Sequence, residues 1–509
     1  MKLHLDEYKD KLLGCWMGKN IGGTLGEPYE GRRGVFNLEF YSQETHGEPL
    51  PNDDLDLQLI WLNAVEKFGN RVNAAILAEY WTIYNVCHNS EYGVAKNNLR
   101  MGLAPPLSGY VDNAFQNSNG SFIRSEIWAC LAPGNPEIAA KYAYEDAIVD
   151  HCGEGVYAEV FLAALESAAF VETDKYKLID IGLSCISDSA NIAYAVRLAV
   201  SLSQSGKTWQ EARTEIMTLL PSDYGTPVDR SAIEVFPPAQ IGNHAPNNIA
   251  LMITGWLHGE DDFGKSICIA VNCGEDTDCT AASLGSILGI IKGIKGIPSR
   301  WTEPVGRDIK TICINLVDEG IIVPKTIDEL TDRIILQTPL FLGTKICDVL
   351  SPGAGYSINV GPSDKLYMTE SKINHYMWKS FLDIVKQSPF CIRNEFVLFS
   401  TVLESDSDPF IASGSQKKFK LTVENTVFNN QWISLKWHVP EGLRIFPENS
   451  VCLPLQQYHG YMAKVDLGFT LECGELHDSL YDLLLEISSI GHITKGIIPV
   501  RLIHKPAAH

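Results

Sequence analysis

Residues 272–280 read Asn272-Cys273-Gly274-Glu275-Asp276-Thr277-Asp278-Cys279-Thr280, and small and apolar residues follow from Ala281 to Gly289. This following run is suited to a tightly packed helix. Asp276 and Asp278 stand two apart in the glycine-containing turn before it. Two carboxylates at a helix start either cap the helix or hold a hard cation. The segment therefore predicts a helix that begins at an oxygen-rich corner.

A second acidic corner lies far upstream, where Asn52-Asp53-Asp54-Leu55-Asp56 precedes the apolar stretch 57–62. Capping alone explains one such corner, because short polar side chains accept the unpaired N–H groups of a helix start. Three acids within four residues exceed what capping needs, and their repulsion calls for a cation or another partner. The two corners are compatible with two helix caps or with one metal site built from both.

Length and charge limit the class of protein. The chain has 509 residues, too many for one core, so two or three domains are expected. Hydrophobic residues make up 45% of the chain, which is ordinary for a soluble globular protein. The formal net charge of −21 argues against a nucleic-acid partner or an anionic membrane surface.

Several sequence signals are absent. Residues 1–10 lack the apolar core of a secretory signal, and no window of about 18 apolar residues predicts a membrane span. The cysteines form no CxxC pair, and most stand among apolar residues, as is typical of small buried hydrophobes in a reducing compartment. We therefore expect a cytoplasmic protein without a zinc site.

Helical periodicity dominates the first 345 residues. Apolar residues recur at helical spacing in 8–20, 156–171, 191–202 and 248–257, and alternating β-branched runs are scarce. We expect a compact all-α domain over residues 1–345. Residues 346–394 are predicted to be a turn-rich connector with one helix over 369–387.

The pattern changes to a period of two from about residue 395. Apolar and polar residues alternate in 418–423, 433–439, 465–471 and 493–503, with turn residues between these runs. Residues 395–509 are therefore predicted to form an antiparallel β-sandwich. Its own large apolar residues are expected to fill a separate core: Trp432, Trp437, Phe469, Leu483 and Leu485. We expect a packing or oligomerisation role for this domain, with carbohydrate or partner binding as the alternative.

Clustered glycines occupy residues 14–31, and no strand precedes them as a dinucleotide-binding fingerprint would require. They are predicted to serve close helix packing and turns. Together with the acidic corners, they form ordered blocks by which the chain resembles the ADP-ribosylglycohydrolase family, of the dinitrogenase-reductase-activating-glycohydrolase type. The resemblance extends over residues 9–295, and its blocks are Gly22 to Glu30, Asn52-Asp53-Asp54, Asn117 to Arg124 and Gly274 to Cys279.

The resemblance implies a mostly helical fold with a cleft that holds two Mg²⁺ ions, although Mn²⁺ or Ca²⁺ would also suit oxygen ligands. The metal ligands that it implies are Asn52, Asp53, Asp54, Asp276 and Asp278. A family glutamate on a mobile flap matches Glu30. The loop that lines the phosphates of the substrate matches Asn119, Gly120 and Ser121, and a histidine of the substrate cleft matches His151. The carboxylates available to handle protons are Glu30, Asp53 and Asp54, and the sequence does not choose among them.

The chain departs from the family pattern beside the implied metals. Asn52 replaces a hydroxyl residue, and Cys279 replaces a threonine ligand with a soft thiol that suits Mg²⁺ poorly. Glu275 replaces a glycine and adds a carboxylate. Asp56 and Glu275 are the acids that we expect to supply the missing oxygens.

The chemistry implied is metal-dependent hydrolysis of a ribosyl glycosidic bond, most simply the removal of ADP-ribose from a modified acceptor. One alternative is hydrolysis of another small furanosyl glycoside or a nucleoside. Another is an inactive protein that binds ADP-ribose or a sugar. The expected partner is thus a small-molecule or ADP-ribosylated substrate, without nucleic acid or membrane.

Overall fold

The computed structural model describes residues 1–30, 32, 34–220, 242–316, 321–349, 355–362, 366–367, 384–385, 387–458 and 461–505. The chain divides into two compact units. The first comprises Met1–Leu99 and Ser108–Glu370, and the second comprises Arg100–Leu107 and Ser371–His509. In the part of the chain described, no helix combines the length and the apolar character needed to cross a membrane.

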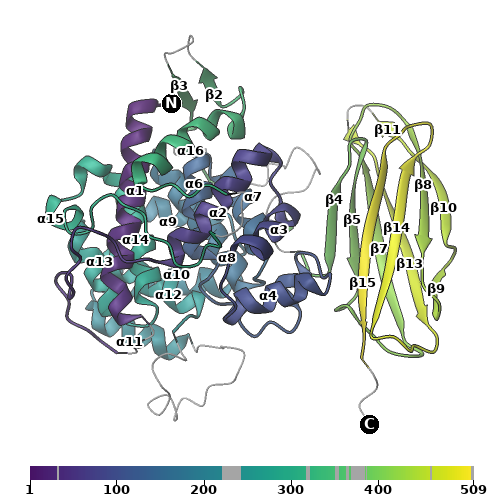
Figure 1. The fold of residues 1–509 in the computed structure, drawn as a ribbon, viewed down its shortest axis with the longest axis horizontal. Helices are drawn as coiled ribbons and strands as arrows, with labels where there is room; N and C mark the ends of the chain where they lie inside the picture. Colours follow the sequence, from purple (N-terminus) through teal and green to yellow (C-terminus); the bar gives the residue numbers. More distant parts are fainter. Residues whose placement is uncertain are drawn as a thin grey trace. The chain divides into compact units, whose positions relative to one another are not determined.

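The first unit is mostly helical, as predicted (Figure 1). The helices that contain the segments singled out in the sequence are α1 (Leu5–Gly26), α2 (Asp53–Phe68), α8 (Glu154–Ala169), α10 (Asn191–Gln204), α12 (Ala245–His258) and α14 (Thr277–Lys292). The remaining α-helices are α3 (Ala74–Tyr84), α4 (Ser90–Arg100), α5 (Leu107–Tyr110), α6 (Glu126–Leu131), α7 (Pro136–Ala147), α9 (Lys175–Ser184), α11 (Trp209–Leu219), α13 (Phe263–Asn272), α15 (Ser299–Thr302) and α16 (Ile327–Leu342). Short 3-10 helices are η1 (Glu27–Tyr29), η2 (Gly69–Arg71), η3 (Phe122–Arg124) and η6 (Ile294–Gly296).

A small sheet in this unit was missed by the sequence analysis. Strands β1 (Lys2–His4), β2 (Cys347–Val349) and β3 (Tyr356–Asn359) form an antiparallel sheet in the order β1-β3-β2. The strands have three or four residues, too few for a period of two to be visible. The helix predicted over 369–387 lies outside the described residues, apart from 384–385 and 387.

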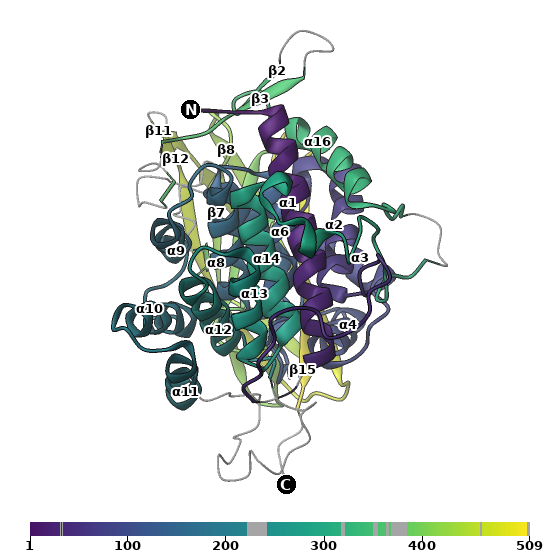
Figure 2. The same ribbon diagram turned by 90° about the vertical axis from the view of Figure 1, so that its left-hand side faces the viewer.

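Helices α1 and α14 run side by side in both views (Figures 1 and 2). Small residues spaced four apart let their backbones touch. A Cβ atom on Gly18 would lie 1.9 Å from the carbonyl oxygen of Gly285, and one on Gly26 would lie 2.3 Å from that of Thr277. Only glycine fits such an approach. Because the register is antiparallel, the end of α1 and the following η1 lie against the start of α14.

The second unit contains the predicted β-sandwich. One five-stranded sheet has the order β10-β8-β14-β15-β6, and the other has the order β4-β5-β7-β13-β9. The strands of the first sheet are β6 (Phe410–Ile411), β8 (Gln431–His438), β10 (Ser450–Leu455), β14 (Leu480–Ser489) and β15 (Lys495–His504). Those of the second are β4 (Cys391–Glu395), β5 (Phe399–Ser405), β7 (Gln416–Asn425), β9 (Leu443–Phe446) and β13 (Lys464–Cys473). A separate hairpin pairs β11 (Gln457–Tyr458) with β12 (Tyr461–Met462).

Both five-stranded sheets contribute to one apolar core, which contains four of the five large residues predicted for it: Trp437, Phe469, Leu483 and Leu485. Trp432 is the exception, because its side chain is 57% exposed. Neighbouring side chains of a strand point to opposite faces, and Ile433, Leu435 and Trp437 occupy the buried face of β8. Trp432 therefore belongs to the outer face.

Candidate functional site

The two acidic corners meet in the structure. Asn52 caps α2 by accepting a hydrogen bond from the Asp54 backbone N–H at 2.7 Å. Its side-chain nitrogen then donates to Asp278 Oδ2 at 3.0 Å, although these residues lie 226 positions apart in the chain. The Cys279 thiol donates to Asp54 Oδ1 at 3.4 Å and joins the corners a second time. The helix starts thus form one cluster.

Asp276 stands at the N-cap position of α14 but makes no capping hydrogen bond. Its Oδ2 instead accepts from the Asn119 side chain at 2.9 Å, and its backbone N–H donates to Asn248 Oδ1 at 3.2 Å. The adjacent Thr277 hydroxyl donates to the Gly26 carbonyl at 2.8 Å, which fixes the start of α14 to the end of α1. Asp276 is therefore held by other segments and not used as an ordinary helix cap.

The donor set fits a hard cation. Asp276 Oδ1 and Asp278 Oδ1 are buried and have no hydrogen-bond donor among the described residues. Two groups of ligand atoms, each within 4.8 Å of one another, come from Asp54, Asp278 and Cys279 and from Glu27, Glu30 and Asp278. Asp278 belongs to both groups. Carboxylate oxygens favour Mg²⁺, Mn²⁺ or Ca²⁺, and the thiol is the one soft member.

Mutual repulsion and burial raise the pKa values of these acids. The charge of Asp278, followed by burial, raises the pKa of Glu30 to about 8. Burial and then Asp278 raise the pKa of Glu27 to about 7 and that of Asp53 to about 6. Burial and Asp278 also hold the pKa of Asp276 well above its usual range. A cation would offset the repulsion that these shifts express.

Other acids near the corners are held by partners of their own. Asp53 Oδ2 accepts a hydrogen bond from the Tyr92 hydroxyl at 3.0 Å. Asp56 Oδ2 accepts from the backbone N–H groups of Ile312 and Cys313, both at 2.6 Å. Glu275 Oε1 lies 3.9 Å from Arg213 Nη2. Asp56 and Glu275, which the sequence analysis expected to supply oxygens, are thus engaged elsewhere.

The loop that resembles a phosphate-lining segment reaches the cluster through Asn119. Ser121 is fully buried, and its hydroxyl donates to the Gly155 carbonyl at 2.7 Å. A Cβ on Gly120 would lie 2.1 Å from Glu91 Oε1, so this glycine permits close packing. Its carbonyl accepts from Arg124 Nη1 at 2.6 Å, which holds the loop from behind.

His151 lies beneath this loop and is fully buried. Its Nε2 is 3.0 Å from the Ser118 hydroxyl and 4.0 Å from Glu91 Oε1, and its Nδ1 is 2.9 Å from Asp150 Oδ1. These neighbours form an internal polar network. The structure therefore places His151 under the loop and away from solvent.

Sequence reasoning missed two residues of the cluster. Glu27 lies three positions before Glu30, at the end of the glycine-rich helix, and this spacing was a usable signal. Lys19 is almost fully buried, and its ammonium lies 3.3 Å from Asp54 Oδ2. Lys19 is the one charged residue in the stretch 12–26, which is otherwise rich in glycine and apolar residues, and this isolation could have indicated a buried charge.

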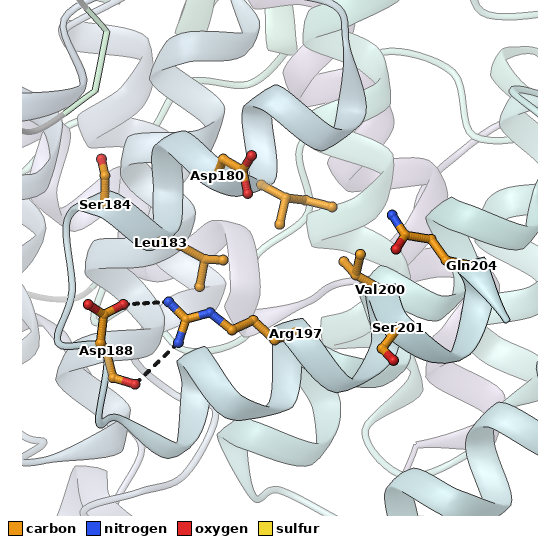
Figure 3. Close-up of a pocket in the computed structure, with 9 residues that line it drawn as sticks. Asp180, Leu183, Ser184, Asp188, Arg197, Val200, Ser201 and Gln204 are labelled. Carbon is orange, nitrogen blue, oxygen red and sulfur yellow. Dashed lines mark hydrogen bonds and ion pairs between the residues drawn. The ribbon is translucent and has the colours of Figure 1, made fainter.

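A separate cavity of about 350 Å³ lies between α9 and α10 (Figure 3). Arg197 points into it and donates from Nη1 to the Asp188 carbonyl at 3.3 Å, and it also forms an ion pair with the Asp188 carboxylate. None of the residues predicted for the site lines this cavity. The positive charge of Arg197 thus already has a partner in Asp188.

Comparison with known proteins identifies the family of the chain. The family model for ADP-ribosylglycohydrolase matches residues 4–337. The chain belongs to this family of glycosyl hydrolases, which acts on ADP-ribosylated substrates and is generally metal-dependent, and it is an enzyme of that type. A comparison with curated proteins found no match.

Three solved structures are similar to part of the chain. An ADP-ribosylglycohydrolase-related protein complex has 19% sequence identity and a TM-score of 0.44, covering 66% of this chain and 99% of that chain. A FixG-related protein from Vibrio parahaemolyticus has 10% identity and a TM-score of 0.17, covering 21% of this chain and 96% of its own. The native conformation of E. coli alpha-2-macroglobulin has 14% identity and a TM-score of 0.18, covering 21% and 7%.

Proposed function

We propose that the acidic cluster is a divalent-metal centre that hydrolyses the bond between C1 of an ADP-ribosyl group and its acceptor. The observation that carries this proposal is that Asp278 lies beside both Asp54 and Asp276, and that Asp276 Oδ1 and Asp278 Oδ1 are buried without a donor among the described residues. These three residues would hold the cation, together with the side-chain oxygen of Asn52. A bound Mg²⁺ would supply charge that binds ribose hydroxyls and orients water.

Glu30 is the carboxylate that we assign to proton transfer. Asp54 is buried, with one oxygen facing the Lys19 ammonium and the other accepting from the Cys279 thiol, so it is poorly placed to exchange protons. Glu30 is exposed, and the charge of Asp278 raises its pKa to about 8. A cation bound beside Asp278 would offset that charge and lower the pKa, so that Glu30 would be a carboxylate near neutral pH. Glu30 would accept the proton of the attacking water. Asn119 would orient the substrate beside Asp276.

A second candidate function is hydrolysis of a small furanoside that carries no phosphate. The density of acids favours it, because Glu27, Glu30, Asp53, Asp276 and Asp278 all repel an anionic diphosphate unless cations intervene. Under this alternative, the sugar hydroxyls alone would be recognised.

The deciding experiment is a substrate panel assayed with Mg²⁺ and with EDTA. The panel contains ADP-ribosyl-arginine peptide, a nucleoside and a 4-nitrophenyl furanoside. We expect Mg²⁺-dependent release of ADP-ribose from the peptide, and no release by Asp276→Ala. Faster turnover of the furanoside would favour the second candidate. Binding of ADP-ribose without turnover of any substrate would show an inactive binding protein.

A further inference from the structure

Lys19 lies in the middle of α1, on the side that faces the interior, and its relative exposure is 2%. Its ammonium donates to the Ile123 carbonyl at 2.7 Å and to Glu126 Oε1 at 2.8 Å, and it lies 3.3 Å from Asp54 Oδ2. Burying a lysine is costly unless its charge is paired. The two carboxylates keep the lysine charged, and Lys19 has a raised pKa that results from the charges of Glu126 and Asp54 outweighing burial.

Glu126 is itself held in one orientation. Its Oε2 accepts from the Gln58 side chain at 2.8 Å, and Gln58 Oε1 accepts from the Ile127 backbone N–H at 2.8 Å. Gln58 lies one turn after Asp54 on α2, and its amide also donates to the Asp54 carbonyl at 2.9 Å. The ammonium is therefore fixed relative to α2 by a closed set of contacts.

The two oxygens of Asp54 consequently face different partners. Oδ2 faces the ammonium, and Oδ1 accepts from the thiol of Cys279, the residue that follows Asp278 in α14. An ammonium beside Oδ2 prevents a divalent cation from approaching both oxygens, because two cations would then share that oxygen. Asp54 is left with a single oxygen for the cluster.

We propose that Lys19 is a positioning residue that presents Asp54 to the metal centre through Oδ1 alone. This inference rests on the proposed function, since it assumes that the cluster binds a cation. Lys19 acts through Asp54 and does not touch the substrate. Loss of the Lys19 ammonium would allow the Asp54 carboxylate to rotate. Metal binding would then weaken, because the contacts that a metal ligand makes with neighbouring residues set its orientation.

The test separates orientation from charge. Lys19→Met combined with Glu126→Gln removes one positive and one negative charge, so the net charge of the residues around Asp54 is unchanged. Glu126→Gln alone is the matched control, because Lys19 still faces Asp54. Mn²⁺ affinity is measured by calorimetry on the full chain, and folding by thermal unfolding. We expect the control to bind within about 3-fold of wild type and the double variant to bind about 10-fold or more weakly.

Each outcome has one meaning. Unchanged Mn²⁺ affinity in a folded double variant overturns the role of Lys19 while the metal centre stands. Absence of Mn²⁺ binding by the wild-type chain overturns the metal centre itself. Lys19→Gln provides a second test, because its amide can still donate to Ile123 and Glu126. It adds net negative charge that favours a cation, so weaker binding supports the positioning role, and equal or tighter binding overturns it.

Discussion

The helix starts of α2 and α14 have similar acidic sequences, yet their acids have different partners. At α2, Asp54 faces the Lys19 ammonium and Asp56 accepts two backbone N–H groups. At α14, Asp276 Oδ2 accepts from the side-chain amide of Asn119, and Asp278 Oδ2 accepts from that of Asn52; both amides are neutral. Amides hold a carboxylate in place without neutralising it. We therefore expect charge left unbalanced, and not the acidic motif alone, to distinguish a cation site from an ordinary helix start.

Asp278→Asn should have the largest effect, because Asp278 belongs to both groups of ligand atoms. We expect Mn²⁺ affinity to fall by more than about 100-fold and hydrolysis to disappear, since ligand charge controls the affinity of oxygen sites. Calorimetry and the release of ADP-ribose measure these losses. Asp262→Asn is the matched control, because Asp262 caps α13 by accepting from the Lys265 N–H at 2.7 Å. If Asp278→Asn and the control bound metal equally well, Asp278 would be an ordinary residue of a helix start and not a metal ligand.

Glu30→Gln should reduce turnover by about 100-fold at saturating Mg²⁺ and change Mn²⁺ affinity by less than about 3-fold, because a proton-transfer group acts on the rate. Glu27→Gln is the companion variant. Glu27 shares a group of possible ligand atoms with Asp278 and has no proton-transfer role in the proposal, so Glu27→Gln should weaken metal binding and keep turnover once the metal is saturating. Wild-type turnover in Glu30→Gln would make Glu30 a surface residue of η1.

Asp56→Ala should destabilise the protein and leave the metal centre working. It removes the acceptor of two backbone hydrogen bonds from Ile312 and Cys313, which we expect to cost about 2 kcal/mol of unfolding free energy. Denaturant unfolding measures the cost, and Mn²⁺ affinity should stay within about 3-fold of wild type. A large loss of metal binding at unchanged stability would place Asp56 among the ligands.

Much of the fold could be predicted from hydrophobic periodicity, and the features that were predicted wrongly have physical reasons. Long amphipathic or small-residue runs predicted α1, α8, α10, α12 and α14, whereas three very short strands were invisible because pairing, not local pattern, creates them. The alternation that buries Ile433 and Trp437 also implies that Trp432 faces outward. The sequence alternation alone thus places Trp432 on the outer face of β8.

The acids of the proposed site could be named from the sequence, but the residues that pair with them could not. The motifs pointed to Asp53, Asp54, Asp276 and Asp278, which the structure brings together with Asn52 and Glu30. The engagement of Asp56 with residues 312–313 depends on a contact 256 positions away, and that of Lys19 with Glu126 spans 107. No local pattern reports such long-range pairings.

The smallest expected effect is a pH dependence of stability that comes from the acids of η1 and of the α2 start. The folded-state pKa values of Glu27, Glu30 and Asp53, about 7, 8 and 6, lie above the ordinary carboxyl values. Because the folded state binds more protons than the unfolded state, stability from these groups is complete below pH 4 and is lost as pH rises toward 8. Without metal, the melting temperature of the helical unit should fall by roughly 2–4 °C between pH 5.5 and 8. Mg²⁺ should raise the melting temperature more at pH 8 than at pH 5.5, because the carboxylates are ionised at pH 8. Asp278→Asn should make the melting temperature depend less on pH, because it removes the charge that raises the pKa of Glu30. A metal-free melting temperature that rises over this range in calorimetric scans would contradict the unbalanced charge assigned to the cluster.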